Sequence, residues 1–458
     1  MNSINASNLF FIGIGGIGMS GLARYFRRRG ARVAGYDRTP SELTNQLQSE
    51  GVDVQFDQNI ALIPEDLRNA SPEEVIIVRT PAVPLDSPIF QYWHQKGARI
   101  LKRAELLGMV TRDHPTIAVA GTHGKTTVSI MLAHLLVTGK VKINAFLGGI
   151  SANYGTNVLL NDAAVVNVVE ADEYDRSFLR LQPEQAIITA MDPDHLDIYG
   201  TPEAMDAAYA EFAALVRGTL MVHDHIQGKF RDRKNVVSYS LESRSIPRVE
   251  NLRVENGKHV FDLIAEGTDI RDLQFGMPGR HNVENAIAAS CLALRLGVTP
   301  ELLREGLRTF RGVARRFEKR IDRKDIVFID DYAHHPREID AFVSSVRELY
   351  PGRKITGVFQ PHLFSRTRDH VHQFASSLAR LDEIILLDIY PAREAPIPGI
   401  DSRWLLQHIS HDAKELCSKG DLVTELRSRK LQVVVTMGAG DIDRLVPDIE
   451  RMLNEKFM

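Results

Sequence analysis

Residues 118–132 read AVAGTHGKTTVSIML, a stretch that constrains the fold of this chain more than any other. A short apolar run ends at Ala120 and enters a turn with Gly121 and Gly124, and a helical apolar pattern follows Lys125. A strand, a glycine turn and a helix start direct backbone N–H groups and the helix dipole towards an anion. This order therefore predicts a phosphate-binding loop in a domain with a parallel sheet.

The usual phosphate loop, G-x-x-x-x-G-K-[ST], has a glycine where this chain has Val119. That position lies on the strand side, where the turn geometry is less demanding. Lys125 would face the β- and γ-phosphates of a nucleotide, and the Thr126 hydroxyl would ligate Mg²⁺. The alternative is a plain strand-to-helix turn rich in small residues, but G-K-T-T directly after a strand favours the phosphate site. The predicted nucleotide contacts of this loop are Gly121, Thr122, His123, Gly124, Lys125, Thr126 and Thr127.

Composition limits the function classes. The 458 residues carry a net charge of -3, with 44% hydrophobic and 25% charged residues, which is typical of globular proteins and argues against a nucleic-acid partner. We expect a cytoplasmic protein with no membrane partner, because the sequence has no long apolar run and no secretory signal pattern. Cys291 and Cys417 lie in helical-looking stretches without metal-type spacing, so we expect incidental thiols.

Strand-like and helix-like stretches alternate along most of the chain, which predicts α/β domains with parallel sheets. We predict a Rossmann-like N-terminal domain over residues 1–112. A central ATPase-type domain over residues 113–318 would hold a mostly parallel sheet and a small antiparallel sheet, with a hairpin turn at Asn256-Gly257. A second Rossmann-like domain would cover residues 319–458. The clearest predicted strands are LFFIGIG, RVAGYD, VIIVRTPAV, TIAVAG, AAVVNVVEAD, QAIITAMD, TLMVHD, KDIVFIDDYA, KITGVFQP, DEIILLDIYP and LQVVVTMGAG.

Two acidic motifs follow predicted strands of the central domain. VVEADEYDRSF places Glu170 and three further carboxylates at a strand end, where open α/β sheets bind ligands and where Mg²⁺ on a triphosphate takes one or two carboxylates. A solvated acidic loop is the alternative. MDPDHLDIYG holds His195 among aspartates, and a capped loop histidine is the alternative there.

Polar motifs also open a central helix and follow two strands of the last domain. Asn282 and Asn285 in RHNVENAIAA could read an adenine edge, or Asn282 could simply cap the helix. DDYAHHP and FQPHLFSRT should share one rim of the C-terminal sheet, where their cations would bind a carboxylate or phosphate. Ordinary surface charge is the alternative. The candidate residues on this rim are Asp330, Asp331, His334, His335, His362 and Arg366.

The N-terminal GIGGIG matches the dinucleotide fingerprint at Gly13, Gly15 and Gly18, and Asp37 ends the next strand near the spacing of a ribose-binding acid. These glycines would serve any pyrophosphate. An NAD-linked dehydrogenase is one alternative that the motif raises, but it leaves GTHGKTT and the acidic motif unexplained.

Together these elements resemble the Mur ligases, the ATP-dependent amide-forming enzymes of peptidoglycan precursor synthesis. The resemblance covers nearly the whole chain, and the order of the elements is more specific than any one of them. Leu363, Ala190 and Arg393 depart from the family pattern. The elements that carry the resemblance are GIGGIGMSG, AGTHGKTT, EADEYDRSF, DPDHLD, HNVENAIAA, GVARRFE, DDYAHHP, FQPHLFSRT and YPAREAPIPG.

The resemblance implies roles for individual residues. Lys125 and Thr126 would hold the ATP phosphates and a first Mg²⁺, with Glu170 as a further ligand and His195 on a second ion. Catalytic residues would be Lys125, His195, His335, His362 and Arg366; the adenosine and hinge contacts would be His281, Asn282, Asn285, Arg316 and Asp331. The sugar-nucleotide contacts would be Gly13, Gly15, Gly16, Gly18, Asp37, Gly148, Gly149 and Asn157.

The resemblance also implies a reaction. GIGGIGMSG and DDYAHHP favour the joining of L-alanine to the lactyl carboxylate of UDP-N-acetylmuramate, with ATP and Mg²⁺ as cofactors and ADP and phosphate as products. The carboxylate would first be activated as an acyl phosphate. His335 and His362 are both candidates for the base that accepts the amine proton. Alternatives are a sister ligase for another amino acid or peptide, and a nucleotide switch without an acceptor. We expect a monomer or a homodimer.

Overall fold

The computed structural model describes residues 7–81, 83–193, 196–255, 258–392 and 394–457. The chain forms two compact units. The first holds the chain up to Arg253, Val260–Phe275 and Val283–Arg311; the second holds Val254–His259, Gly276–Asn282 and the chain from Gly312. Within the described ranges, no helix is both long and apolar enough to cross a bilayer. The predicted turn residues Asn256 and Gly257 and the family departure Arg393 lie outside the described residues.

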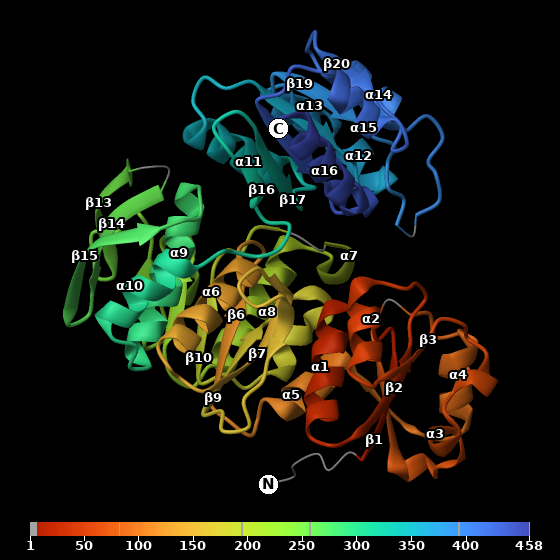
Figure 1. The fold of residues 1–458 in the computed structure, drawn as a ribbon. Coiled ribbons are helices and arrows are strands. Elements are labelled where there is room, and N and C mark those ends of the chain that lie inside the picture. Colours follow the sequence, from red (N-terminus) through yellow and green to blue (C-terminus); the bar gives the residue numbers. More distant parts are fainter. Residues whose placement is uncertain (1–6, 82, 194–195, 256–257, 393, 458) are drawn as a thin grey trace. The chain divides into compact units, whose positions relative to one another are not determined.

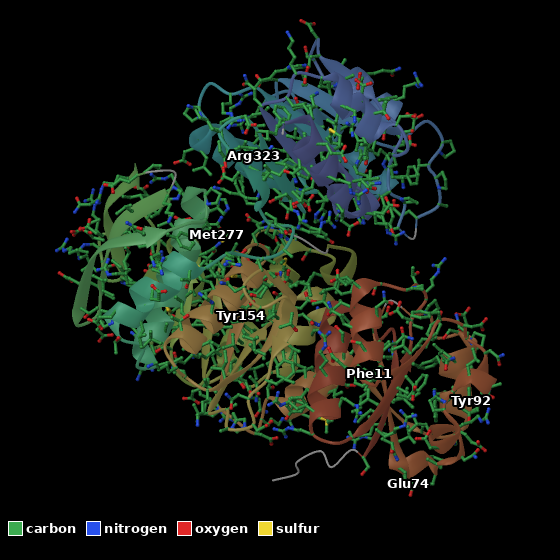
Figure 2. All side chains as sticks on the ribbon, viewed as in Figure 1. Phe11, Glu74, Tyr92, Tyr154, Met277 and Arg323 are labelled. Carbon is green, nitrogen blue, oxygen red and sulfur yellow. The ribbon has the colours of Figure 1, made fainter. Side chains whose placement is uncertain are left out.

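The N-terminal sheet is five-stranded and parallel, in the order β3-β2-β1-β4-β5. Alternate residues of β1 face opposite layers. Phe11 packs in the core with residues of α1 (Figures 1 and 2), and Phe10 packs with Trp93 of α4. The strand order reverses between β1 and β4, so a crevice opens at their carboxyl ends. The strands are β1 (Asn8–Ile12), β2 (Arg32–Tyr36), β3 (Asp53–Gln55), β4 (Val75–Arg79) and β5 (Arg99–Lys102). The helices are α1 (Ile17–Arg28), α2 (Glu42–Ser49), α3 (Glu65–Asn69), α4 (Pro88–Gln95) and α5 (Arg103–Val110), with 3₁₀ turns η1 (Ile60–Leu62) and η2 (Pro72–Glu74).

The second sheet has seven strands in the order β12-β11-β10-β6-β9-β7-β8, and only the β7–β8 pair is antiparallel. β6 is central, because it pairs with β10 on one side and β9 on the other. The strands are β6 (Thr116–Ala120), β7 (Ile143–Ser151), β8 (Thr156–Leu159), β9 (Val166–Glu170), β10 (Gln185–Ile188), β11 (Leu220–His223) and β12 (Val236–Tyr239). The helical segments are α6 (Lys125–Thr138), η3 (Tyr174–Arg180), α7 (Leu196–Tyr199), α8 (Pro202–Leu215) and η4 (Asp224–Phe230).

A three-stranded sheet, β13 (Arg248–Glu255), β14 (Lys258–Ala265) and β15 (Thr268–Phe275), follows in the order of the chain. Two residues join β14 to β15, a connection that only an antiparallel pair allows. Helices α9 (Arg280–Arg295) and α10 (Pro300–Thr309) come next, and the Thr299 side chain caps α10. The small antiparallel sheet is therefore present, as the sequence predicted.

The C-terminal sheet has six strands in the order β16-β17-β21-β18-β19-β20, and β16 is its antiparallel edge. Cys417 follows β20 and is not helical, contrary to the sequence prediction, because a short edge strand ends there. The strands are β16 (Glu318–Asp322), β17 (Val327–Asp331), β18 (Ile355–Phe359), β19 (Glu383–Leu386), β20 (Lys414–Leu416) and β21 (Val433–Met437). The helices are α11 (Pro336–Leu349), α12 (Phe364–Asp369), α13 (Val371–Leu378), α14 (Ser402–His408), α15 (Leu422–Ser428) and α16 (Val446–Lys456), with η5 (Asp441–Leu445).

Candidate active site

The phosphate loop lies between β6 and α6. Gly121 has φ +130°, and an added Cβ would overlap Thr189 of the neighbouring strand end. Gly124 has φ +80° and precedes the first residue of α6. Both turns favour glycine because a Cβ strains the left-handed region. Val119, where the usual motif has glycine, is a buried β6 residue paired with Glu170, so its side chain leaves the turn intact.

Lys125 points into the acidic segment that follows β9. Its Nζ donates to Glu173 Oε1 at 2.8 Å and to the Gly121 carbonyl at 2.7 Å. The lysine side chain is 14% exposed and the glutamate 1%. Burial opposes the ammonium charge, but Glu173, Glu170 and Asp172 raise the pKa of Lys125 above its usual value. The loop therefore carries a fixed positive charge at its centre.

Glu170 ends β9 beside this lysine. The Thr126 hydroxyl donates to its carboxylate, while Oε2 is buried without a hydrogen-bond partner among the described residues. Burial raises the pKa of Glu170. Gly148 of β7 faces the same carboxylate so closely that an added Cβ would overlap it. A glycine cradle, a hydroxyl and an unpaired carboxylate oxygen fit Mg²⁺, which prefers oxygen ligands and takes few of them from protein when it carries phosphates.

His195, predicted as a second metal ligand and catalytic residue, lies outside the described residues. Across the part of the chain that is described, no cluster of three or more His, Cys, Asp or Glu side chains has metal-binding geometry. Thr126 and Glu170 therefore would rely on phosphate oxygens and water to complete a Mg²⁺ shell.

The remaining loop residues have distinct surroundings. The Thr122 hydroxyl accepts from the Asp192 backbone N–H at 3.1 Å, and His123 Nε2 lies 3.5 Å from the Asp192 carboxylate. Thr127 is half-buried in the first turn of α6. Asn285 of α9 packs on Gly124, with its Oδ1 3.0 Å from the position of an added Cβ. Asn285 is thus beside the phosphate loop, where the sequence predicted a nucleotide contact.

Asn282 and His281, two predicted adenosine contacts, lie in the first turn of α9. Asn282 is the third residue of α9 and not its cap; its side chain donates to the Pro278 carbonyl at 2.7 Å. His281 packs on Gly279, where an added Cβ would lie 2.6 Å from the ring.

The N-terminal glycine loop is held from below by Asp37. The Gly15 N–H donates to Asp37 Oδ2 at 2.7 Å, so this carboxylate, predicted as a substrate contact, also supports the loop. Gly13 has φ +89°, and an added Cβ would lie 2.5 Å from Thr80. Gly16 caps α1 through its extended backbone. Gly18 packs against the Arg103 side chain.

A cavity of about 180 Å³ lies between the end of the N-terminal glycine loop and Glu170, the candidate Mg²⁺ ligand. Asn157 is buried and ties β8 to α1: its amide donates to Ser20 Oγ at 2.9 Å and its oxygen accepts from Arg24 at 2.8 Å. Gly149 of β7 is half-buried next to Gly148. The cavity is lined by Ile17, Gly18, Gly21, Arg103, Leu107, Phe146, Leu147, Gly148, Asn157, Glu170 and Asp172.

Sequence reasoning missed two cations that hold the acidic segment. Arg103 Nη2 lies 3.3 Å from Asp172 Oδ2, and Lys102 Nζ lies 2.9 Å from Asp175 Oδ2. Lys102 ends β5 and Arg103 begins α5, and they lie 73 and 69 positions before their partners. No local pattern could have found them, because the contact exists only once the sheets pack.

The second unit gathers a cluster of imidazoles. His362 stacks on Tyr390 with ring centroids 5.7 Å apart, and its Nδ1 lies 3.3 Å from Arg366. His334 approaches the His362 ring at 5.9 Å, and burial lowers the pKa of His334. His335, the predicted candidate, caps α11 and faces another histidine ring. Position 363, a departure from the family pattern, holds a leucine with φ 72° between these groups.

Arg316 and Asp331 lie in the same unit. Arg316 Nη1 is 3.5 Å from Glu338, and its guanidinium covers the Tyr332 ring at 5.3 Å. Asp331 is buried and accepts from the backbone N–H groups of Phe317 at 2.6 Å and Ala333 at 2.7 Å. Burial raises the pKa of Asp331 to about 7. Within this unit, then, Asp331 supports the backbone around β17, a role that sequence reasoning did not foresee.

Three family models match the chain. They are described as the Mur ligase family catalytic domain over residues 8–115, the Mur ligase middle domain over residues 119–293, and the Mur ligase glutamate ligase domain over residues 315–440. Their order agrees with the order of the motifs in the sequence.

Relatives match over the full length. The UDP-N-acetylmuramate–L-alanine ligase of Flavobacterium johnsoniae is 46% identical and is covered completely, as is this chain. The enzyme of the same name from Christiangramia forsetii is 48% identical, with 97% of each chain covered. Among solved structures, the UDP-N-acetylmuramate–alanine ligase of Thermotoga maritima is 25% identical with a TM-score of 0.83, covering 98% of this chain and 99% of that one. The chain belongs to the Mur ligase family.

Proposed function

We propose that this protein ligates L-alanine to the lactyl carboxylate of UDP-N-acetylmuramate, using ATP and releasing ADP and phosphate, as the names of its full-length relatives suggest. The position of Glu170 is the geometric observation that supports this proposal most directly. Glu170 lines the cavity beside the N-terminal glycine loop, where Gly148 faces it, and the same carboxylate raises the pKa of Lys125. A sugar acid bound at the first loop would therefore present its carboxylate next to the phosphates held by the second.

A carboxylate reacts poorly with an amine at neutral pH, because its negative charge repels the nucleophile. Attack of the lactyl oxygen on the γ-phosphorus breaks the bond to ADP and gives an acyl phosphate. The alanine amine then attacks the acyl carbon, and the tetrahedral intermediate expels phosphate. Lys125 would hold the transferred phosphoryl group by charge, and its contact with Glu173 fixes its position before the nucleotide arrives.

Mg²⁺, when bound, would neutralise charge on the phosphate oxygens. Thr126 and Glu170 would hold it, since they present a hydroxyl and a carboxylate oxygen on adjoining elements. His195 remains the candidate ligand for a second ion. Arg366 and His362 would bind the amino acid, and His334, His335 or His362 would accept the amine proton. Among these, His334 is favoured as a neutral base because burial lowers its pKa.

The three parts of the sequence would divide the work. Residues 1–112 would bind the UDP-sugar, residues 113–318 ATP, and residues 319–458 would bring the amino acid. Arg316 at the hinge and Asp331 in the last domain would approach the nucleotide. His281, Asn282 and Asn285 would contact the adenosine. The protein would act in the cytoplasm as a monomer or a homodimer, with small molecules as its only substrates.

Phosphate release tests this proposal directly. It should require ATP, UDP-N-acetylmuramate and L-alanine together, and the nucleotide product should be ADP. Release with another amino acid or a peptide in place of L-alanine would support a sister ligase. Release without any acceptor would support a simple ATPase, and an absorbance change with NAD would support a dehydrogenase; each of these outcomes contradicts the proposal.

A further inference from the structure

The Arg103 side chain lies between the N-terminal glycine loop and the acidic segment that follows β9. It packs on Gly18 at the start of α1, and its Nη2 reaches Asp172 at 3.3 Å in the segment after β9. Gly18 permits this approach, because an added Cβ would overlap the guanidinium. Arg103 is the first residue of α5, so the backbone that carries it is fixed by a helix start.

The cavity wall carries more negative than positive side chains. Glu170 and Asp172 are both acidic, and Arg103 is the one cation among the lining residues. Ile17, Leu107, Phe146 and Leu147 supply an apolar wall. An anion that enters such a space needs a cation to replace its water, and a guanidinium offers two parallel donors to a carboxylate.

The ion pair between Arg103 and Asp172 is weak enough for a substrate anion to replace Asp172. It is a single N–O approach at 3.3 Å, and the two side chains are 26% and 36% exposed. The pair between Lys125 and Glu173 is shorter, at 2.8 Å, and almost fully buried. A partly exposed ion pair contributes little free energy, so a substrate carboxylate can displace Asp172 at small cost.

We propose that Arg103 binds the lactyl carboxylate of the sugar acid and gives up Asp172 when it does so. This inference rests on the proposed function and names the residue that recognises the acid group. The apolar wall would receive the lactyl methyl group. Asp172 Oδ1 accepts from the Tyr174 N–H at 3.1 Å, so the release would free only Oδ2. The arrival of the sugar acid would thus leave one more carboxylate oxygen without its cation among the charges that act on Lys125 and Glu170.

A binding comparison without ATP and L-alanine tests the inference. Two ligands are titrated by calorimetry: UDP-N-acetylmuramate, which carries the lactyl acid, and UDP-N-acetylglucosamine, which has the same nucleotide and diphosphate but no acid. Arg103→Gln should weaken binding of the acid roughly 10- to 100-fold, the range for a lost charge-assisted pair, and change binding of the neutral sugar less than about twofold. Arg103→Lys should recover part of the loss, because it keeps the charge without the fork.

Arg28→Gln is the matched control. Arg28 pairs with Asp162 outside the cavity, at 2.9 Å, and its replacement should leave both affinities unchanged. Equal weakening of both ligands by Arg103→Gln would assign Arg103 to the diphosphate and overturn the inference. No weakening of either, with an unchanged melting temperature, would leave Arg103 only a support for Asp172 and would also overturn it. Failure of the proposed function would appear in the phosphate-release assay and not in the titrations. The wild-type protein would then release no phosphate from ATP when UDP-N-acetylmuramate and L-alanine are both present.

Discussion

The two glycine loops of the first unit are built alike and charged differently. Each follows a central strand of a parallel sheet and opens a helix, α1 or α6. The N-terminal loop contains no charged residue and is held by an acid beneath it, Asp37, through the Gly15 N–H. The second loop carries Lys125, locked on Glu173, with Glu170 beside it.

This difference agrees with the two tasks that we propose for the loops. Backbone N–H groups at a helix start bind a phosphate without changing it. Transfer of a phosphoryl group also needs a fixed cation and oxygen ligands for a metal, and we propose that Lys125 and Glu170 supply them at the second loop. Backbone geometry therefore suits both loops to phosphate binding. The side chains around each loop would decide whether the phosphate is only bound or is transferred.

The largest expected effect comes from removing the cation. Lys125→Met should lower the rate of phosphate release roughly 10³-fold or more, because the phosphoryl group loses its charged partner. Binding of UDP-N-acetylmuramate, measured by calorimetry, should remain near the wild-type value. Because the substitution leaves Glu173 buried without its cation, Lys125→Met combined with Glu173→Gln should restore the melting temperature but not the activity. A double variant with full activity would remove the distinction between the loops.

A smaller effect is expected from closing the space beside Glu170. Gly148→Ala should displace the Glu170 carboxylate, so we expect roughly 10- to 100-fold slower phosphate release and a higher Mg²⁺ concentration for half-maximal rate. Gly276→Ala is the control, since no atom lies within 4 Å of an added Cβ and its φ is not positive. An unchanged Mg²⁺ dependence would show that Glu170 is not a metal ligand.

A substitution that weakens the N-terminal loop should affect the binding of UDP-N-acetylmuramate and not the rate of the chemical step. Asp37→Ala removes the acceptor of the Gly15 N–H and should raise KM for UDP-N-acetylmuramate roughly 5- to 10-fold, the cost of about one hydrogen bond. The value of kcat and KM for ATP should stay near wild type. Asp57→Ala, which removes a similar backbone acceptor for Asn59 in the same sheet region, is the control. A loss confined to kcat would contradict the assignment of this loop to binding.

The last prediction concerns the stability of the second unit and not its activity. Burial raises the pKa of Asp331 to about 7, so the folded state favours the neutral acid. Its contribution to the free energy of unfolding is therefore full below about pH 4, the pKa in the unfolded chain, and falls as the pH rises to about 7. Chemical denaturation between pH 4 and 8 should show this decline, and Asp331→Asn should flatten it. A carboxyl carbon resonance that titrates near pH 4 would contradict the raised pKa.

The alternation of apolar and polar stretches was sufficient for the fold class and for most central strands, since buried parallel strands are continuous apolar runs. Edge and irregular strands such as β3 (Asp53–Gln55) and β20 (Lys414–Leu416) were missed, because they are short and polar and depend on their neighbours for pairing. The β7–β8 hairpin is also absent from the clearest predicted strands, and glycines such as Gly148 have a low strand propensity.

The candidate site divides in the same way. The phosphate loop, the acidic segment and the N-terminal glycines are local motifs, and the structure places each at a strand end. Arg103 and Lys102 reach the acidic segment only through packing. His335 was chosen from the same motif as His334, but the helix start turns the two imidazoles towards different partners.

The sequence by itself determined where the two glycine turns form, because glycine, lysine and threonine at fixed spacing act within a few residues of one another. Only the tertiary structure decided which charges meet across those turns. Arg103 and Asp172 are 69 positions apart and become neighbours because two sheets pack through α1 and α5. Contacts at that separation depend on how whole layers fit together, and no short stretch of sequence records them.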